Sequence, residues 1–188
     1  VEALREAAGD PVCHRYPSYA GWTELREIFA GYFNERFGVK LDPAREVLAL
    51  IGSKEGIGHT PLAMLNPGEV ALVPEPAYPV YRTSTIFAGG EPYEMPLLEE
   101  NGFFPNLRAI PAEVCSRARL MFINYPNNPT SAAATVEQLT QAVEFGRRHG
   151  IVVCHDAAYA ETYFGDPPPS ILSVPGAKDV AIEFHSLS

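Results

Sequence analysis

Cysteine is scarce in this chain and follows no pattern. The three cysteines are Cys13, Cys115 and Cys154. An odd, scattered set fits neither a disulfide framework nor the short spacing of a metal site, and it favours a reducing, cytoplasmic location. His14 and His59 show no ligand spacing either, so we expect no metal centre.

Basic residues and long apolar runs are also lacking. Lys and Arg number 14 against 23 Asp and Glu, which leaves a net charge of −9. A nucleic-acid-binding face needs clustered Lys and Arg, so we expect no nucleic-acid partner. No apolar run approaches the ~18 residues of a membrane span, and no signal peptide is recognisable. The chain opens with Val1 rather than Met, and we expect both of its ends to be incomplete.

The chain has the length of one domain, and strand and helix signals alternate along it. Hydrophobic residues make up 46% of it, enough for a sizeable core. The alternation predicts an α/β fold with a largely parallel sheet. Strands are expected over residues 47–51, 70–73, 93–97, 120–124, 151–156 and 180–184. Helices are expected over residues 23–37, 53–65, 79–88 and 135–150.

Local signals sharpen several helices. The first has an apolar face at helical spacing, formed by Leu25, Ile28, Phe29, Tyr32, Phe33 and Phe37, and Gly38 ends it. Pro61 lies inside the second helix, so we expect a kink or a late helix start there. Thr135 and Gln138 predict a capping box for the fourth helix.

Polar and aromatic residues follow the predicted strands, whose carboxyl ends share one edge where ligands bind. Gly52-Ser53-Lys54 opens a helix, and its free N–H groups suit a phosphate. A glycine at this place is also ordinary turn chemistry, and the segment is neither a Walker motif nor a dinucleotide fingerprint. Both interpretations stay open.

Asp156 ends an apolar strand, where a carboxylate is costly to bury without a partner. It would either cap a helix beginning at Ala157 or form a salt bridge to a protonated ring nitrogen. The second role would keep a pyridine protonated at neutral pH and so keep it an electron sink.

The remaining candidates have plain structural interpretations as well. Asn127-Asn128-Pro129-Thr130 reads as a local turn. Tyr78 and Tyr159 would by default be half-buried aromatics with solvated hydroxyls. His155 and His185 alternate with apolar residues on strands, and we interpret both as structural rather than as lining a pocket.

Together, six motifs resemble the class I/II aminotransferases of fold type I, which use pyridoxal 5'-phosphate (PLP). Within this family, the motifs are most similar to those of the LL-diaminopimelate, aspartate and alanine aminotransferases. The resemblance covers nearly the whole chain. The motifs are Tyr16-Pro17-Ser18-Tyr19-Ala20-Gly21, Gly52-Ser53-Lys54-Glu55-Gly56, Tyr78-Pro79-Val80-Tyr81, Asn124-Tyr125-Pro126-Asn127-Asn128-Pro129-Thr130, Asp156-Ala157-Ala158-Tyr159 and Ser186-Leu187-Ser188.

The resemblance implies PLP as the cofactor and gives four residues a role at its ring. Tyr78 matches the aromatic side chain that stacks on the pyridine. Asn128 and Tyr159 match the pair that hydrogen-bonds the phenolic oxygen, and Asp156 matches the partner of the ring nitrogen.

The resemblance also implies a phosphate site and a homodimer. Ser53, Lys54 and Ser186 match phosphate-binding positions. Tyr16 matches a tyrosine that reaches the phosphate of the neighbouring subunit. Pro17 biases Tyr16 away from helical backbone, so this segment is expected to be extended.

The chain departs from the family pattern in its lysines, because Lys40, Lys54 and Lys178 are the only ones it has. None stands where the family's cofactor-binding lysine is found, and we expect that lysine directly after Ser188. No catalytic residue is therefore expected within the chain, and these 188 residues alone should show no turnover.

The resemblance further implies that residues 1–188 are part of the PLP-binding large domain, a parallel sheet with helices on both faces. The small carboxy-terminal domain, with its carboxylate-binding arginine, is absent. So is a further antiparallel strand, expected beside residues 47–51, and without it the sheet would have a gap.

The function that follows is transfer of an amino group between an amino acid and a 2-oxo acid. Three alternatives remain. One is a PLP-dependent lyase or decarboxylase of the same fold, and another is a non-catalytic PLP-binding effector domain. The third is a plain nucleotide-binding α/β domain, which the order of Asn128, Asp156 and Tyr159 disfavours.

Overall fold

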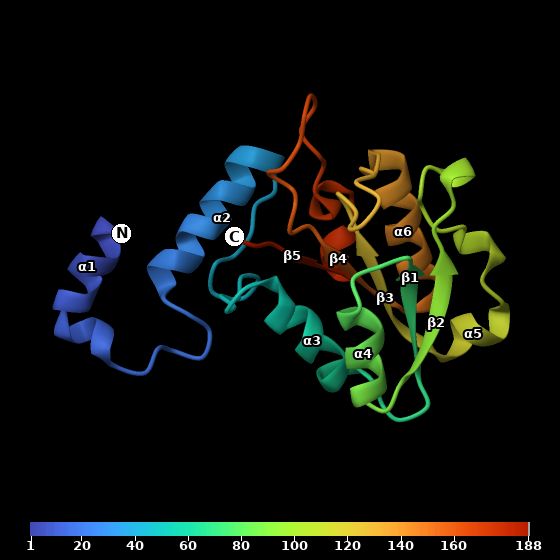
Figure 1. Cartoon of the computed structure of the whole chain (residues 1–188), viewed down its shortest axis with the longest axis horizontal. Coiled ribbons are helices and arrows are strands. Elements are labelled where there is room, and N and C mark those ends of the chain that lie inside the picture. Colours follow the sequence, from blue (N-terminus) through green and yellow to red (C-terminus); the bar gives the residue numbers. More distant parts are fainter. Residues whose placement is uncertain (188) are drawn as a thin grey trace. The chain divides into compact units, whose positions relative to one another are not determined.

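The computed structural model of the protein describes residues 1–187 (Figure 1). The predicted turn at Ser186-Leu187-Ser188 therefore ends outside the described residues. The chain forms two compact units, residues 1–49 and 50–188, and each is treated by itself. Among the described residues, no helix has both the length and the apolar character needed to cross a membrane.

The first unit holds α1 (Glu2–Gly9), a 3-10 turn η1 (Pro11–His14) and α2 (Thr23–Phe37). The prediction for α2 is confirmed at both ends, and Gly38 closes the helix with a φ of 69° and a bond from its N–H to the Asn34 carbonyl. The segment of Tyr16, residues 15–22, is non-helical as expected.

The apolar face predicted for α2 is mostly not buried. Of the residues on this helix only Ala30 and Phe33 are buried, and Ile28 is 66% exposed. Tyr32, Phe33 and Phe37 pack their rings against one another instead, with centroids 5.3 to 5.9 Å apart. Helical spacing thus predicted which side chains share a face, but not what covers them.

The second unit is a five-stranded parallel sheet in the order β2-β1-β3-β4-β5. Its strands are β1 (Val70–Glu75), β2 (Glu91–Pro96), β3 (Ala118–Asn124), β4 (Val152–Asp156) and β5 (Ala181–Phe184). Its helices are α3 (Ser53–Met64), α4 (Val80–Phe87), α5 (Ala112–Arg117) and α6 (Val136–His149), with 3-10 turns η2 (Glu99–Asn101), η3 (Leu107–Ala109), η4 (Ile171–Ser173) and η5 (Ala177–Asp179). The predicted α/β fold with a parallel sheet is confirmed.

The predicted strand at residues 47–51 is wrong, because this segment has no regular structure. A strand exists only where a neighbouring strand completes its hydrogen bonds. Within the described residues β5 is the last strand on this side of the sheet. The apolar residues at 47–51 have the composition of a strand, but no neighbouring strand in the described structure pairs with them.

Alternation along the strands sends side chains into two cores. On β3, Met121 and Ile123 join the core that contains Leu139 of α6. Leu120 and Phe122 point the other way, into the core that contains Ile57 of α3 and Tyr81 of α4. Both faces of the sheet are therefore covered by helices, as the resemblance implied.

Helix starts in the second unit follow local chemistry. The late start considered for the helix containing Pro61 is wrong, since α3 begins at Ser53 and runs through the proline. Gly52, with a φ of 81°, turns the chain into the helix, and the Glu55 carboxylate accepts the N–H of Ile51 at 2.6 Å. The predicted capping box of Thr135 and Gln138 is confirmed in both of its hydrogen bonds.

The strand order places a switch point at β1. From β1 the chain passes through α4 to β2 on one side, and β3 lies on the other side of β1. In open α/β sheets, the crevice outside the carboxyl ends of two such strands is where ligands bind. The carboxyl ends of β1 and β3 therefore mark the place for a site.

Candidate functional site

Most of the predicted site residues come together along the carboxyl edge of the sheet. Tyr78 follows β1, Asn128 follows β3, Asp156 ends β4 and Ser186 follows β5. Tyr159 lies three residues beyond Asp156, and Ser53 and Lys54 open α3. Tyr16 belongs to the first unit.

Asp156 is the best-defined side chain of this edge. It is 5% exposed, its Oδ2 accepts a 2.7 Å hydrogen bond from the Tyr81 hydroxyl, and its Oδ1 accepts the Ala158 N–H at 3.2 Å. Burial raises the pKa of Asp156, and these hydrogen bonds only partly offset that effect. The helix-cap interpretation is wrong, because the residues after Asp156 form a turn and no helix.

Tyr81 belongs to one of the six motifs, but the sequence did not predict it as a site residue. Its ring is fully buried, stacks on Phe122 at 5.0 Å between centroids and meets Tyr78 edge-on at 5.9 Å. Burial, together with the Asp156 charge, raises the pKa of Tyr81. Its hydroxyl therefore stays protonated and donates a hydrogen bond to Asp156. The i, i+3 spacing of Tyr78 and Tyr81 at the start of α4 was the available signal.

Asn124, the last residue of β3, joins the loop beyond β3 to the end of β4. Its side-chain N–H donates to the Asp156 carbonyl at 2.9 Å, while its Oδ1 accepts the Asn128 N–H at 2.7 Å. The predicted local turn after it is confirmed, since Asn127 Oδ1 accepts both the N–H and the hydroxyl of Thr130. The Asn124 side chain therefore connects the backbone of Asn128 to the backbone of Asp156.

The start of α3 suits an anion. Its first turn has no side-chain cap, Ser53 is half-buried and Lys54 is exposed. A Cβ added at Gly56 would lie 2.7 Å from the Phe184 ring, so α3 packs tightly on the end of β5, two residues before Ser186. The positive end of α3, where Ser53 and Lys54 stand, thus begins one turn from the end of β5.

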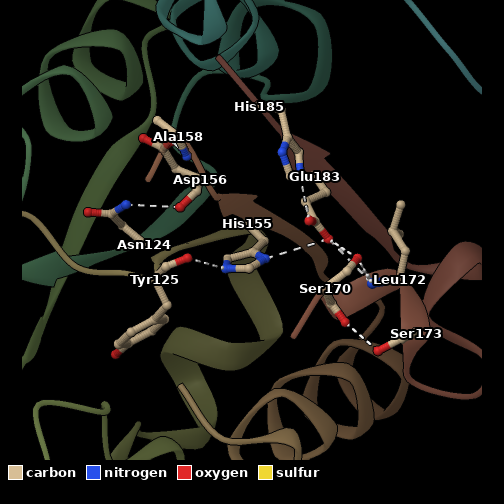
Figure 2. Close-up of polar contacts among 10 residues, drawn as sticks. All are labelled: Asn124, Tyr125, His155, Asp156, Ala158, Ser170, Leu172, Ser173, Glu183 and His185. Atoms are coloured by element: carbon tan, nitrogen blue, oxygen red, sulfur yellow. Dashed lines mark hydrogen bonds and ion pairs between the residues drawn. The ribbon is translucent and has the colours of Figure 1, made fainter. Parts of the chain in front are cut away.

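Tyr159, His155 and His185 differ in their exposure and contacts. Tyr159 is 43% exposed. His155 is 1% exposed and faces the opposite side of the sheet from Asp156, where its Nε2 lies 3.2 Å from the Tyr125 carbonyl oxygen (Figure 2). His185 is bonded to the buried Glu183. The structural interpretation of both histidines agrees with these contacts.

The donor set fits PLP. Among residues 1–187, the side-chain oxygens of the buried Asp156 accept hydrogen bonds from the neutral hydroxyl of Tyr81 and one amide, so a protonated ring nitrogen is the cationic partner that burial favours. The α3 terminus fits the phosphate, and Tyr78 offers a ring next to Tyr81, the residue that donates to Asp156. Among residues 1–187, no group of three or more His, Cys, Asp or Glu side chains could hold a metal ion.

Comparison with known proteins agrees with this geometry. The family model described as aminotransferase class I and II matches residues 1–188. The chain is 56% identical over 189 residues to the LL-diaminopimelate aminotransferase of Syntrophobacter fumaroxidans and 55% identical to that of Aquifex aeolicus. Each match covers 100% of this chain and 49% of the relative, so the chain spans about half the length of these relatives.

Solved structures match equally well. A substrate-bound BacF structure from Bacillus subtilis superposes with a TM-score of 0.97 at 42% identity, covering 100% of this chain and 48% of that one. A probable N-succinyldiaminopimelate aminotransferase from Thermus thermophilus gives a TM-score of 0.93 at 39% identity, with coverage of 100% and 50%. The family resemblance drawn from the six motifs is confirmed.

Proposed function

Because this chain belongs to the class I and II aminotransferases, we propose that it is the cofactor-binding part of an enzyme that moves an amino group between an amino acid and a 2-oxo acid, with PLP as cofactor. The observation that carries the proposal is the buried carboxylate of Asp156 at the carboxyl end of β4, whose hydrogen-bond donors in the described part of the chain are neutral. The names of the relatives make LL-diaminopimelate the first amino donor to test.

PLP, when bound, supplies an electron sink for the negative charge that develops at the amino acid's α-carbon. Asp156 would hold a proton at the pyridine nitrogen through a charge-assisted hydrogen bond. Tyr81 would keep the Asp156 carboxylate oriented, and Tyr78 would stack on the ring. Asn128 and Tyr159 would hydrogen-bond the phenolic oxygen.

The phosphate of the cofactor would lie at the start of α3. The N–H groups there, the Ser53 and Ser186 hydroxyls and the Lys54 ammonium would bind it. The lysine expected after Ser188 lies outside the described residues. Residues 1–188 would then form part of the large domain of the enzyme, which we place in the cytoplasm on the basis of three free cysteines.

The test uses the full-length protein, reconstituted with PLP and assayed for amino transfer from LL-diaminopimelate to a panel of 2-oxo acids. We expect an absorbance change on PLP binding and formation of a new amino acid from one of the acceptors. Release of ammonia or CO₂ without amino transfer would instead identify a lyase or decarboxylase. Failure to bind PLP would refute the proposal as a whole.

We also propose a homodimer in which Tyr16 reaches the phosphate of the partner subunit. Its side chain is fully exposed in the single chain. Tyr16→Phe should weaken PLP binding by roughly 1.5–3 kcal/mol, the worth of a hydrogen bond to a charged group.

Mixing two impaired full-length variants, Tyr16→Ala and Asp156→Asn, tests the reach across subunits. A heterodimer has one pocket with both groups intact, so activity should return. If heterodimers form without recovery, Tyr16 does not act across the interface.

A further inference from the structure

Glu183 is a buried carboxylate that the proposed chemistry does not use. It lies on β5 directly opposite His155 of β4 in the sheet register, and its side chain is 1% exposed (Figure 2). Its Oε2 accepts the Ser170 hydroxyl at 2.6 Å, and its Oε1 lies 2.7 Å from Nε2 of His185. The Leu172 N–H lies 3.4 Å from Oε2.

His155 contacts neighbours with both of its ring nitrogens. Its Nε2 lies 3.2 Å from the Tyr125 carbonyl oxygen, which can only accept, so Nε2 carries a proton. Its Nδ1 lies 3.7 Å from Glu183 Oε2, beyond a hydrogen bond but within ion-pair distance. The ring therefore lies between the Tyr125 carbonyl and the Glu183 carboxylate. Burial alone would raise the pKa of Glu183, but the two imidazoles hold it well below its usual range.

The partners of Glu183 lead to three separate segments of the candidate site. His155 holds the carbonyl of Tyr125, which begins the loop to Asn128, and it directly precedes Asp156 in the chain. His185 directly precedes Ser186. One carboxylate thus connects the ring-nitrogen partner, the loop of Asn128 and the phosphate-binding end of β5.

Stability alone does not call for such a cluster. Well-packed apolar residues in place of a buried ion pair are often neutral or stabilising, because the charges must be desolvated. The cluster also stands on the face of the sheet away from Tyr81, where apolar residues of α6 and η4 otherwise fill the core. Its position at the ends of β4 and β5 points to alignment of those ends.

We propose that Glu183 is a positioning residue for the cofactor site, which holds the Tyr125–Asn128 loop and the Asp156 and Ser186 segments in register through His155 and His185. The inference rests on the proposed function, since it concerns the affinity for PLP. Ser170 and the Leu172 amide fix the carboxylate from η4.

The test measures PLP affinity and thermal unfolding of the full-length protein with and without PLP. Glu183→Gln keeps the shape and removes the charge. We expect its dissociation constant for PLP to rise on the order of 10-fold, the loss of a hydrogen bond to a charged group, and the rise in Tm on adding PLP to shrink accordingly. Ser173→Ala is the matched control: it removes the 2.6 Å bond to the Ser170 carbonyl at the start of η4 but keeps the Ser170 hydroxyl, the Leu172 amide and both imidazoles that contact Glu183.

A double variant tests the route through His185. If Glu183 acts through this imidazole, adding His185→Gln to Glu183→Gln should raise the dissociation constant by no more than about 2-fold further. If Glu183→Gln does not fold, the PLP affinity of His185→Gln alone tests the inference. The His185 side chain is 22% exposed, so replacing it leaves no cavity in the core. This variant should weaken PLP binding at least about 3-fold, in line with one lost hydrogen bond.

Wild-type affinity in the folded Glu183→Gln protein, or in His185→Gln where the first does not fold, would overturn the inference and leave the proposed function standing. Equal weakening by Ser173→Ala would overturn it too, because the effect would then be general loosening of η4. A wild-type protein that binds no PLP would remove the proposed function and this inference with it.

Discussion

Asp156 and Glu183 are two buried carboxylates at the ends of neighbouring strands, and their surroundings shift their pKa values in opposite directions. Asp156 faces the aromatic side of the sheet, where a phenol and an amide are its hydrogen-bond donors, and burial raises its pKa. Glu183 faces the other side, where two imidazoles hold its pKa down against burial.

The difference separates a binding group from a supporting one. Both oxygens of Glu183 already have partners within the protein, so this carboxylate can hold neighbours in place but has little to offer a ligand. The charge of Asp156 is not balanced by any cation bonded to it, so a cationic ligand would gain most there. The predictions below test this contrast, beginning with the largest expected effect.

Asp156→Asn should lower the rate of amino transfer by the full-length protein on the order of 10³-fold, about 4 kcal/mol, because an amide cannot hold the ring nitrogen protonated. Single-turnover absorbance kinetics would measure it. The cofactor-free variant should be at least as stable as wild type, since a neutral side chain is less costly to bury. Normal turnover would reduce Asp156 to a structural residue.

His155→Leu should destabilise the cofactor-free protein by about 3 kcal/mol, because Glu183 loses one of its two imidazole partners while staying buried. Urea unfolding would measure it. Adding Glu183→Leu should restore most of the loss, since an apolar pair replaces an unbalanced charge. A double variant less stable than the single one would mean that packing, rather than charge, dominates on this side.

Tyr81→Phe should lower kcat/KM roughly 10-fold, about 1.5 kcal/mol, by removing one hydrogen bond to the Asp156 carboxylate while keeping the stacked ring. Ser84→Ala is its control on the same helix, since the Ser84 hydroxyl bonds only to carbonyls of α4. A loss of activity in the control as large as in Tyr81→Phe would assign the effect to α4 packing.

The smallest expected effect, about 1 kcal/mol, is in the pH dependence of unfolding between about pH 6 and pH 3. Glu183 has a lowered pKa, so its stabilisation is present above its ordinary pKa of 4.5 and shrinks as the pH falls below that value. Asp156 has a raised pKa, so its burial cost disappears as the pH falls.

Urea unfolding of the cofactor-free variants at several pH values should therefore separate the two groups. Glu183→Gln should lose less stability on acidification than wild type, and Asp156→Asn should lose more. The same slope in both variants would mean that the two carboxylates do not differ as described.

Sequence patterns by themselves determined the elements whose causes are local. Short apolar runs predicted β1, β3, β4 and β5, the capping box predicted the start of α6, and Gly38 predicted the end of α2. The six motifs also placed Asp156, Tyr78 and the start of α3 at one edge, because the carboxyl ends of parallel strands must share it.

The tertiary structure alone decided which distant residues meet. Tyr81 and Asp156 are 75 positions apart, and Glu183 and Ser170 are 13 apart on different elements. No local pattern encodes such pairs, since they depend on strand order and on which side of the sheet each residue faces. For the same reason the apolar segment 47–51 is not a strand and the apolar face of α2 is only partly buried: a propensity becomes structure only where a neighbour completes its hydrogen bonds or covers its surface.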